Sequence, residues 1–207
     1  MPADKSLFFY GWIYHKFLDP HQAEARELIA GLIPEGSSVL DIACGTGQLC
    51  FALRAQKQCR VVGIDLSLRM LQFAEKANRY HNVKFVHQDA TDLAGFGDHT
   101  FDYAIVLILM HELPNEKQLC VLSEALRVAD KTIIVDASVP LPKNLSGLGV
   151  RFVEATLGRD HHDYFRNFLT NGGIMGLLEN SGLPITIAHR SVFWHNCREV
   201  IVVSRQQ

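Results

Sequence analysis

The stretch Val39-Leu40-Asp41-Ile42-Ala43-Cys44-Gly45-Thr46-Gly47-Gln48-Leu49 decides the fold. An apolar run reaches a carboxylate, passes through a glycine turn and opens into a helical pattern, which is how α/β proteins build a nucleotide-binding corner. Gly45 and Gly47 permit the sharp turn and a close approach to a ligand, with which a Cβ would collide. Asp41, at the strand end, would repel the pyrophosphate that a dinucleotide brings to this helix N-terminus. The corner therefore suits a ligand with a positive end.

The segment Asp41–Leu49 resembles motif I of the class I S-adenosylmethionine-dependent methyltransferases, in the branch of quinone and small-molecule methyltransferases. Ala43 stands where the family has its first glycine, whereas Gly45 and Gly47 keep the two tight positions. The resemblance implies S-adenosyl-L-methionine as cofactor and S-adenosyl-L-homocysteine as product. The ammonium and sulfonium groups of that cofactor provide the positive end that Asp41 favours.

Other expected strand ends carry residues that suit the same cofactor. Asp65 follows Gly45 by 20 positions, and a carboxylate there can accept hydrogen bonds from both ribose hydroxyls. The resemblance places Asp89 against the adenine amine, and it places Leu107 and Ile108 at the methionine end. The cofactor-binding residues expected in all are Tyr14, Asp41, Ala43, Cys44, Gly45, Thr46, Gly47, Asp65, Leu66, Met70, Asp89, Ala90 and Leu107.

Structural roles remain open for some of these residues. Asp65 taken alone could cap a helix, and Asp89 taken alone could begin a turn. We interpret Cys44 as a small packing residue rather than a nucleophile.

Short β-branched runs alternate with amphipathic segments from residue 37 onward. This pattern predicts the α/β class, as a Rossmann-like seven-stranded, mostly parallel sheet with helices on both faces and an antiparallel last strand. Helices are expected to begin at caps formed by Asp19-Pro20, Ser67 and Asn115. The expected strands are 38–42, 60–65, 83–87, 103–107, 132–135, 185–188 and 199–203.

The length predicts a single domain over residues 1–207. Its expected parts are an N-terminal aromatic lid with helices, a cofactor-binding core, a substrate cap, and a final helix with closing strands. These parts span 1–36, 37–138, 139–173 and 174–207.

Composition excludes several classes of function. Apolar residues make up 48% of the chain, charged residues 20%, and the net charge is −2 without a basic block, so a nucleic-acid partner is not expected. The apolar run from Tyr103 to Met110 is too short to span a bilayer. The N-terminal residues lack the layout of a signal peptide, and five cysteines without a C-x-x-C pair favour reduced thiols, so we expect a cytoplasmic location. The oligomeric state stays open, and a homodimer is one possibility.

Methyl transfer from an activated sulfonium depends mainly on placement and on the exclusion of water. A base is needed only where the acceptor must lose a proton. His111 follows the fourth expected strand and is the candidate base, although it could instead cap or pack the loop before Pro114. His161, His162 and Asp163 are a second option.

The region Phe101–Pro114 is similar to the family segment F-D-x-(apolar run)-L-H-H-L, with Glu112 replacing the second histidine. The aromatic-rich stretch Leu7–Asp19 resembles the segment Y-D-x-x-(Y/F)-D that folds over the cofactor. In that resemblance Tyr14 reaches the methionine carboxylate, and Tyr10 is the alternative.

Further aromatic residues favour a small apolar or aromatic acceptor in a roofed pocket, unless they simply form core packing. These residues are Phe152, Tyr164, Phe165 and Phe168.

Two rival functions differ from this interpretation. An NAD-dependent oxidoreductase would need a third glycine near Cys50, and a non-catalytic binding module would bind the cofactor without turnover. The histidines lack a metal-site spacing such as H-E-x-x-H, so no metal is expected. The cysteines also lack a clear match to the thiol cluster of arsenite methyltransferases.

Overall fold

The computed structural model describes residues 22–206, which divide into two compact units after Gln88. The predicted N-terminal cap at Asp19-Pro20, the aromatic stretch and Tyr14 lie outside the described residues. No helix in the described part of the chain is both long enough and apolar enough to cross a membrane.

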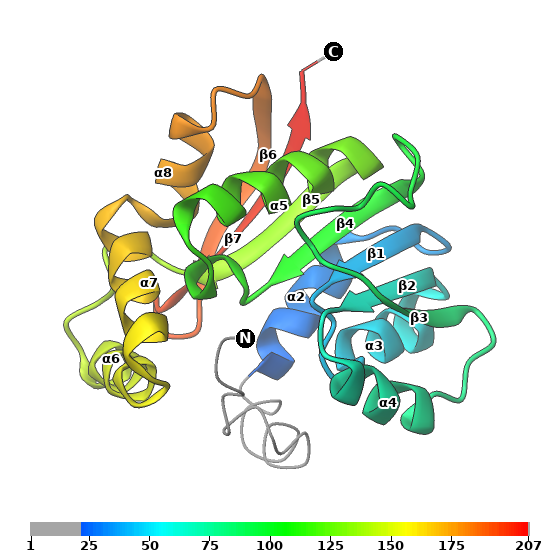
Figure 1. The fold of residues 1–207 in the computed structure, drawn as a ribbon, viewed down its shortest axis with the longest axis horizontal. Coiled ribbons are helices and arrows are strands. Elements are labelled where there is room, and N and C mark those ends of the chain that lie inside the picture. The colour runs from blue at the N-terminus through cyan, green and yellow to red at the C-terminus, as the bar shows by residue number, and fades with distance from the viewer. Residues whose placement is uncertain (1–21, 207) are drawn as a thin grey trace. The chain divides into compact units, whose positions relative to one another are not determined.

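The described part of the first unit, residues 22–88, contains three parallel strands and three helices (Figure 1). Its elements are α2 (Ala23–Leu32), β1 (Ser38–Ile42), α3 (Gln48–Lys57), β2 (Arg60–Asp65), α4 (Leu68–Ala77) and β3 (Val83–His87). The central strand β2 pairs with β1 on one side and β3 on the other. Asp41 is paired with Gly63 in this register, so the carboxyl ends of β1 and β2 lie at the same edge.

The local sequence explains where these elements begin. The three strands have the predicted bounds. The Ser67 hydroxyl accepts a hydrogen bond from the Met70 N–H at 3.3 Å, so Ser67 caps α4 as predicted. Leu49, Cys50 and Leu53 form the buried face of α3, which packs against β2 and β3.

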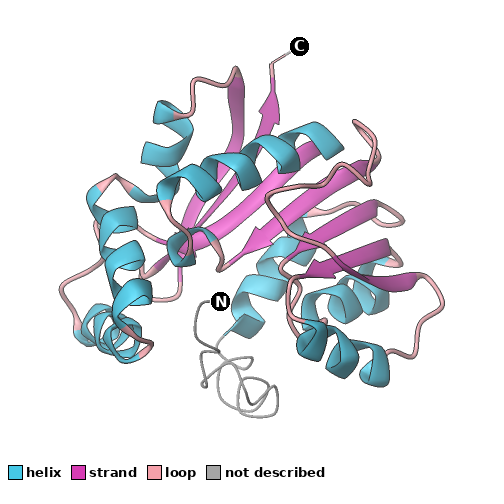
Figure 2. Cartoon of the chain, in the orientation of Figure 1, coloured by secondary structure: helices cyan, strands magenta, loops and turns pink. Residues whose placement is uncertain are grey.

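The second unit contains four strands in the order β4-β5-β7-β6 (Figure 2). β4 (Phe101–Leu107) and β5 (Ala129–Ala137) are parallel, whereas β7 (Arg198–Arg205) runs antiparallel to both β5 and β6 (Ile185–Phe193). Its helices are the short 3-10 helix η3 (Met110–Glu112), α5 (Asn115–Val128), α6 (Leu145–Thr156), α7 (Arg159–Thr170) and α8 (Gly173–Asn180). The predicted α/β class with an antiparallel last strand is confirmed.

Some predicted boundaries in this unit are wrong. Asn115 does not cap α5: Pro114 occupies the N-cap, and no side chain forms a cap hydrogen bond there. All four strands are longer than predicted, because β4 pairs with β5, and β6 with β7, along most of their length. The predicted cap region contains α6 and α7, and α7 ends before Gly172, whose φ of +89° suits glycine.

Candidate functional site

The glycine turn after β1 has three residues with positive φ. These are Ala43 at +60°, Gly45 at +53° and Gly47 at +78°. A Cβ on Gly47 would lie 2.6 Å from Cζ of Phe85, whereas a Cβ on Gly45 would have nothing within 4 Å. Gly47 is therefore required by packing inside the unit, and its close approach to a ligand stays a prediction. The open space lies at Gly45.

Asp41 is a buried carboxylate with few partners to replace the water that it loses on burial. Its side chain is 2% exposed, and the Cys50 thiol donates a hydrogen bond to Oδ2 at 3.1 Å. Among the residues that the structure describes, it forms no ion pair. Burial raises the pKa of Asp41 to about 7, a rise that the thiol hydrogen bond opposes and the nearby charge of Asp65 reinforces. A cationic ligand group would satisfy this carboxylate.

Asp65 is held at the end of β2 by backbone donors. Oδ2 accepts the Gly45 N–H at 2.8 Å, and Oδ1 accepts the Ser67 N–H at 2.8 Å. Burial raises the pKa of Asp65, and these N–H groups oppose the rise. The two carboxylates at the ends of adjacent strands make this edge negative, so it disfavours a pyrophosphate and favours a cation.

Of the other residues in the first unit that were predicted to bind the cofactor, some are buried and one is exposed. Leu66, beside Asp65, is 63% exposed and presents an apolar side chain at the surface. Met70 and Thr46 are buried. Cys44 Sγ lies 2.9 Å from the position of a Cβ on Gly63, which supports the interpretation of Cys44 as a packing residue.

The predicted cofactor residues of the second unit have local structural roles. Asp89 Oδ1 accepts the N–H of Thr91 at 2.9 Å and its hydroxyl at 2.7 Å, and these bonds lower the pKa of Asp89. Asp89 thus begins a turn, and its contact with adenine stays a prediction, as does that of the half-buried Ala90. Leu107 ends β4, and the next residue, Ile108, has a φ of +57°. A β-branched residue in that conformation is strained, and such strain concentrates at functional sites.

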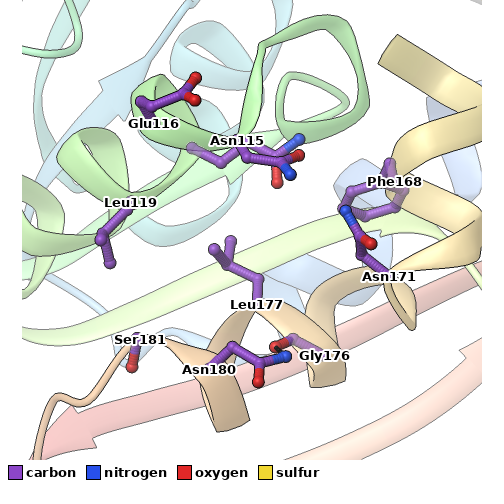
Figure 3. A pocket seen from close by; sticks show the side chains of 11 residues that line it. Asn115, Glu116, Leu119, Phe168, Asn171, Gly176, Leu177, Asn180 and Ser181 are labelled. Atoms are coloured by element: carbon purple, nitrogen blue, oxygen red, sulfur yellow. Dashed lines mark hydrogen bonds between the residues drawn. The ribbon is translucent and has the colours of Figure 1, made fainter. Parts of the chain in front are cut away.

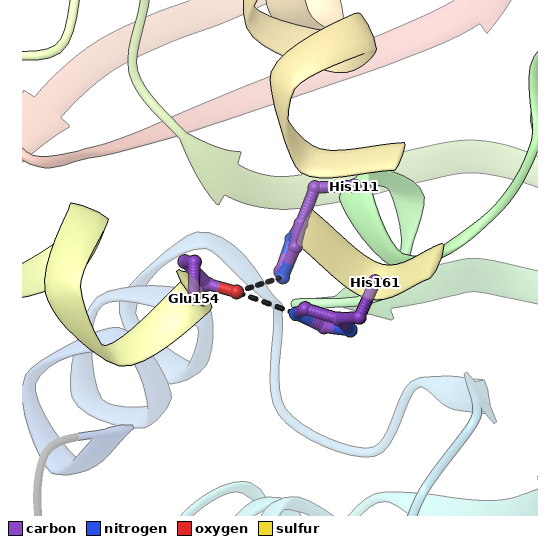
Figure 4. A group of neighbouring side chains, drawn as sticks. All are labelled: His111, Glu154 and His161. Atoms are coloured by element: carbon purple, nitrogen blue, oxygen red, sulfur yellow. Dashed lines mark hydrogen bonds and ion pairs between the residues drawn. The ribbon is translucent and has the colours of Figure 1, made fainter. Parts of the chain in front are cut away.

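His111 lies in a buried cluster with Glu154 and His161 (Figure 4). Its side chain is 2% exposed, and Nδ1 lies 2.6 Å from Asp136 Oδ1. Nε2 lies 3.7 Å from Glu154 Oε2, and the same oxygen lies 2.5 Å from Nε2 of His161. Burial opposes protonation of His111, but the charge and hydrogen bond of Asp136 raise its pKa to about 9. A general base needs a nitrogen free for the substrate's proton, so the geometry does not favour this role, which stays a prediction.

The fold brings together only some of the residues that were expected as an alternative base or as the aromatic roof of the pocket. His161 joins the His111 cluster, whereas Asp163 is exposed. Phe165 and Phe168 are buried, and Phe165 packs edge-on against His111 with ring centroids 5.5 Å apart. Phe152 is 72% exposed, so these residues do not form one roof.

A cavity of about 440 Å³ lies in the second unit between α5, α7 and α8 (Figure 3). Its wall is mixed, with the amides of Asn115, Asn171 and Asn180 beside Leu119 and Leu177. A cavity of this volume has the size of a small-molecule site.

Sequence reasoning missed three residues of these clusters. Asp136 lies near the end of β5, so the rule that located Asp41 and Asp65 could have found it. Glu154 lies on α6, and no local spacing predicts that it meets His161 of α7, which the sequence had indicated only as a second catalytic option. Cys50 was considered only as a missing glycine, although it is the hydrogen-bond partner of Asp41.

Residues 39–132 match the family described as "Methyltransferase domain". A demethylmenaquinone methyltransferase of Bacillus licheniformis is 31% identical over 145 residues, which are 66% of this chain and 61% of that protein. A protein of the same name from Staphylococcus aureus is 34% identical over 136 residues, or 61% of this chain and 55% of that protein. The chain thus spans less than two thirds of the length of these relatives.

Two solved structures show the fold. A Pyrococcus horikoshii protein, PH0226, has a TM-score of 0.70 with 21% identity and covers 92% of each chain. The magnesium protoporphyrin IX methyltransferase of Synechocystis, solved with SAH bound, has a TM-score of 0.68 with 20% identity, over 98% of this chain and 96% of that one. The predicted Rossmann-like fold and the resemblance to class I S-adenosylmethionine-dependent methyltransferases are confirmed.

Proposed function

We propose that this chain, whose residues 39–132 match the methyltransferase-domain family, transfers a methyl group from S-adenosylmethionine to a small molecule. The observation that carries the proposal is Asp41, a carboxylate buried at the end of β1 with only a thiol as its side-chain partner among the described residues. When bound, S-adenosylmethionine supplies a methyl group on a positively charged sulfur.

The residues of the first unit would bind and orient this cofactor. Asp41 would attract the positive amino-acid end through its charge. Each carboxylate oxygen has two acceptor sites, so Asp65 can hold the Gly45 and Ser67 N–H groups and still accept ribose hydroxyls. Leu66 would cover one face of the base. The contribution of these residues to the rate is to place the reacting groups and exclude water.

The acceptor we propose is aromatic and quinone-like, methylated on carbon or oxygen. The names of the two relatives, at 31% and 34% identity, support this class. The charge balance of the chain, 20 basic against 22 acidic residues without a basic block, favours a small molecule over a nucleic acid. We further propose a cytoplasmic location.

Calorimetric titration with S-adenosylmethionine, S-adenosylhomocysteine and NAD in parallel tests the cofactor. We expect binding of the first two and none of NAD. Asp65→Ala should lose most of the affinity, while Glu75→Ala, which removes an exposed carboxylate of the same unit, should bind as the wild type does. Equal binding by both variants would place the cofactor elsewhere.

Transfer itself is tested with cofactor labelled on the methyl group. The labelled cofactor is incubated with reduced demethylated quinones and with a metabolite extract. Label in an organic-soluble product supports the proposal. Tight binding of S-adenosylmethionine without label in any product would instead identify a non-catalytic binding module.

A further inference from the structure

The cluster around His111 brings together three side chains from three separate elements. His111 comes from η3, Glu154 from α6 and His161 from α7. All three are buried, at 1%, 5% and 6% exposure. Their potential ligand atoms all lie within 4.8 Å of one another, and in Figure 4 the three side chains point toward a common centre. We propose that His111, Glu154 and His161 bind one divalent transition-metal ion with the coordination chemistry of Zn²⁺.

The donor set fits this class of ion. Two imidazole nitrogens and one carboxylate oxygen form a set that zinc accepts and that leaves a fourth position open. Magnesium and calcium prefer oxygen ligands, so this set discriminates against them. Residues 111, 154 and 161 do not have the spacing of a known metal-binding motif, so only the folded chain brings these three ligands together.

All three distances between ligand atoms lie within about 1.4 Å of the value for tetrahedral zinc ligands, since none exceeds 4.8 Å. Tetrahedral ligands about 2.1 Å from zinc lie roughly 3.4 Å apart. His111 Nε2 and Glu154 Oε2 are separated by 3.7 Å, close to that value. His161 Nε2 and Glu154 Oε2 are now 2.5 Å apart, at hydrogen-bond distance, and would separate by less than about 1 Å when a metal replaced the hydrogen bond.

Asp136 supplies the support that a ligating histidine needs. Metal-binding histidines usually donate their second ring N–H to a carboxylate or a carbonyl, which orients the ring. Here His111 Nδ1 donates to Asp136 Oδ1 at 2.6 Å, which directs Nε2 toward Glu154. Asp136 is itself fixed, because it accepts the N–H groups of Ala137 at 2.6 Å and His111 at 3.2 Å. This arrangement orients His111 before any ion binds.

The charges around the cluster also suit a cation. Two carboxylates lie beside His111, since Asp136 Oδ1 is 2.6 Å from Nδ1 and Glu154 Oε2 is 3.7 Å from Nε2. Their negative charge would offset that of a divalent cation bound between Glu154 and the two histidines. The rival interpretation is a network of ion-paired histidines that holds η3, α6 and α7 together without a metal.

Metal stoichiometry separates the two interpretations. The full chain is stripped with a chelator, loaded with Zn²⁺, desalted and analysed by elemental mass spectrometry. The proposal predicts one zinc per chain, and it predicts that Mg²⁺ at the same concentration neither binds nor changes the melting temperature. Co²⁺ loaded in place of zinc should give visible absorption bands typical of nitrogen and oxygen ligation in four- or five-coordinate geometry.

Variants locate the ion. His161→Gln and Glu154→Gln should each weaken zinc binding by at least about 100-fold. His162→Gln, which changes the neighbouring imidazole on α7, should retain one zinc per chain. Zinc should raise the melting temperature of the wild type and of His162→Gln, and leave that of His161→Gln unchanged. Binding of S-adenosylmethionine is measured on the same variants, so that a failure of the metal site is distinguishable from a failure of the proposed function.

Two results would overturn the proposal. One is a wild-type chain that retains well under one zinc after desalting, which requires no variant to fold. The other is an unchanged stoichiometry in His161→Gln, which would place the ion elsewhere. Either result would leave the metal-free histidine network as the role of the cluster.

Discussion

Replacement of Asp41 by asparagine should stabilise the unliganded protein and weaken its binding of S-adenosylmethionine. Asparagine has nearly the same shape and keeps an oxygen that can accept the Cys50 thiol hydrogen bond. The substitution therefore removes the buried charge with little change in packing. The two effects have opposite signs because the charge is costly to the fold and attractive to a cation.

The size of the stability effect follows from the pKa. Asp41 has a pKa near 3.8 in the unfolded chain and about 7 in the folded chain, so the folded state binds the proton more tightly. The stability that this proton provides is complete below pH 3.8 and is lost as the pH rises to about 7. Each pH unit corresponds to about 1.4 kcal/mol, so the whole interval amounts to about 4 kcal/mol. Asp41→Asn should therefore be more stable than the wild type by up to about 4 kcal/mol at pH 8, and by much less near pH 5.

Urea denaturation at pH 5, 6, 7 and 8 measures this difference. Glu75→Gln is the matched control, because Glu75 is an exposed carboxylate of the same unit and its replacement should give no comparable increase of stability with pH. Calorimetry on the same samples measures cofactor binding. The wild type should bind more tightly as the pH rises toward 8, whereas Asp41→Asn should bind about 10- to 100-fold more weakly at pH 8, the effect of one charged hydrogen bond.

Either of two outcomes would refute the reasoning. A stability difference that is the same at pH 5 and pH 8 would show that ionisation of Asp41 is not the source of the cost. An unchanged affinity at pH 8 would show that Asp41 does not attract the positive end of the cofactor.

Three further substitutions test the turn and the second unit by urea denaturation. Gly47→Ala should destabilise by about 2–4 kcal/mol, because it adds left-handed strain and a clash with the Phe85 ring; a loss below 1 kcal/mol would contradict this. Ala43→Gly should stabilise by about 0.5–1 kcal/mol, since relief of strain at a φ of +60° exceeds the entropic cost of glycine; a less stable variant would show that the strain is absent. Arg127→Lys should lower the free energy of unfolding by about 2 kcal/mol. The guanidinium forms two hydrogen bonds to Glu124 and others to the loop before β4, and a single ammonium cannot reproduce them. An unchanged stability would show that one positive charge suffices.

The first unit was largely predictable because its signals are local. A parallel strand, a glycine turn and a helix follow one another within twelve residues, and each has its own residue preferences. The end of β2 at Asp65 was found by the same rule. The role of Gly47 was not predictable, because Phe85 lies 38 positions further along the chain, and only the parallel register of β3 brings its ring to the turn.

The second unit was less predictable because its polar cluster is built by tertiary contacts. The spacing of His111 and His161 carries no information until η3 and α7 pack together. The wrong cap at Asn115 has a local cause. Asparagine is a good N-cap, but Pro114, with a φ of −65° and a ψ of 155°, already has the extended conformation of that position.

The features of the first unit that lower its folding stability lie at the turn after β1. Asp41 is a buried carboxylate whose ionisation opposes folding, and two residues later Ala43 adopts a conformation that costs about 1 kcal/mol in a residue other than glycine. A fold selected only for stability would have an asparagine and a glycine there, and both changes are compatible with the local geometry. The retained carboxylate has a physical explanation if a cation offsets its cost in the liganded state. Asp41 is therefore better evidence for a cofactor-binding turn than the glycines are, because the glycines are compatible with a purely structural turn as well.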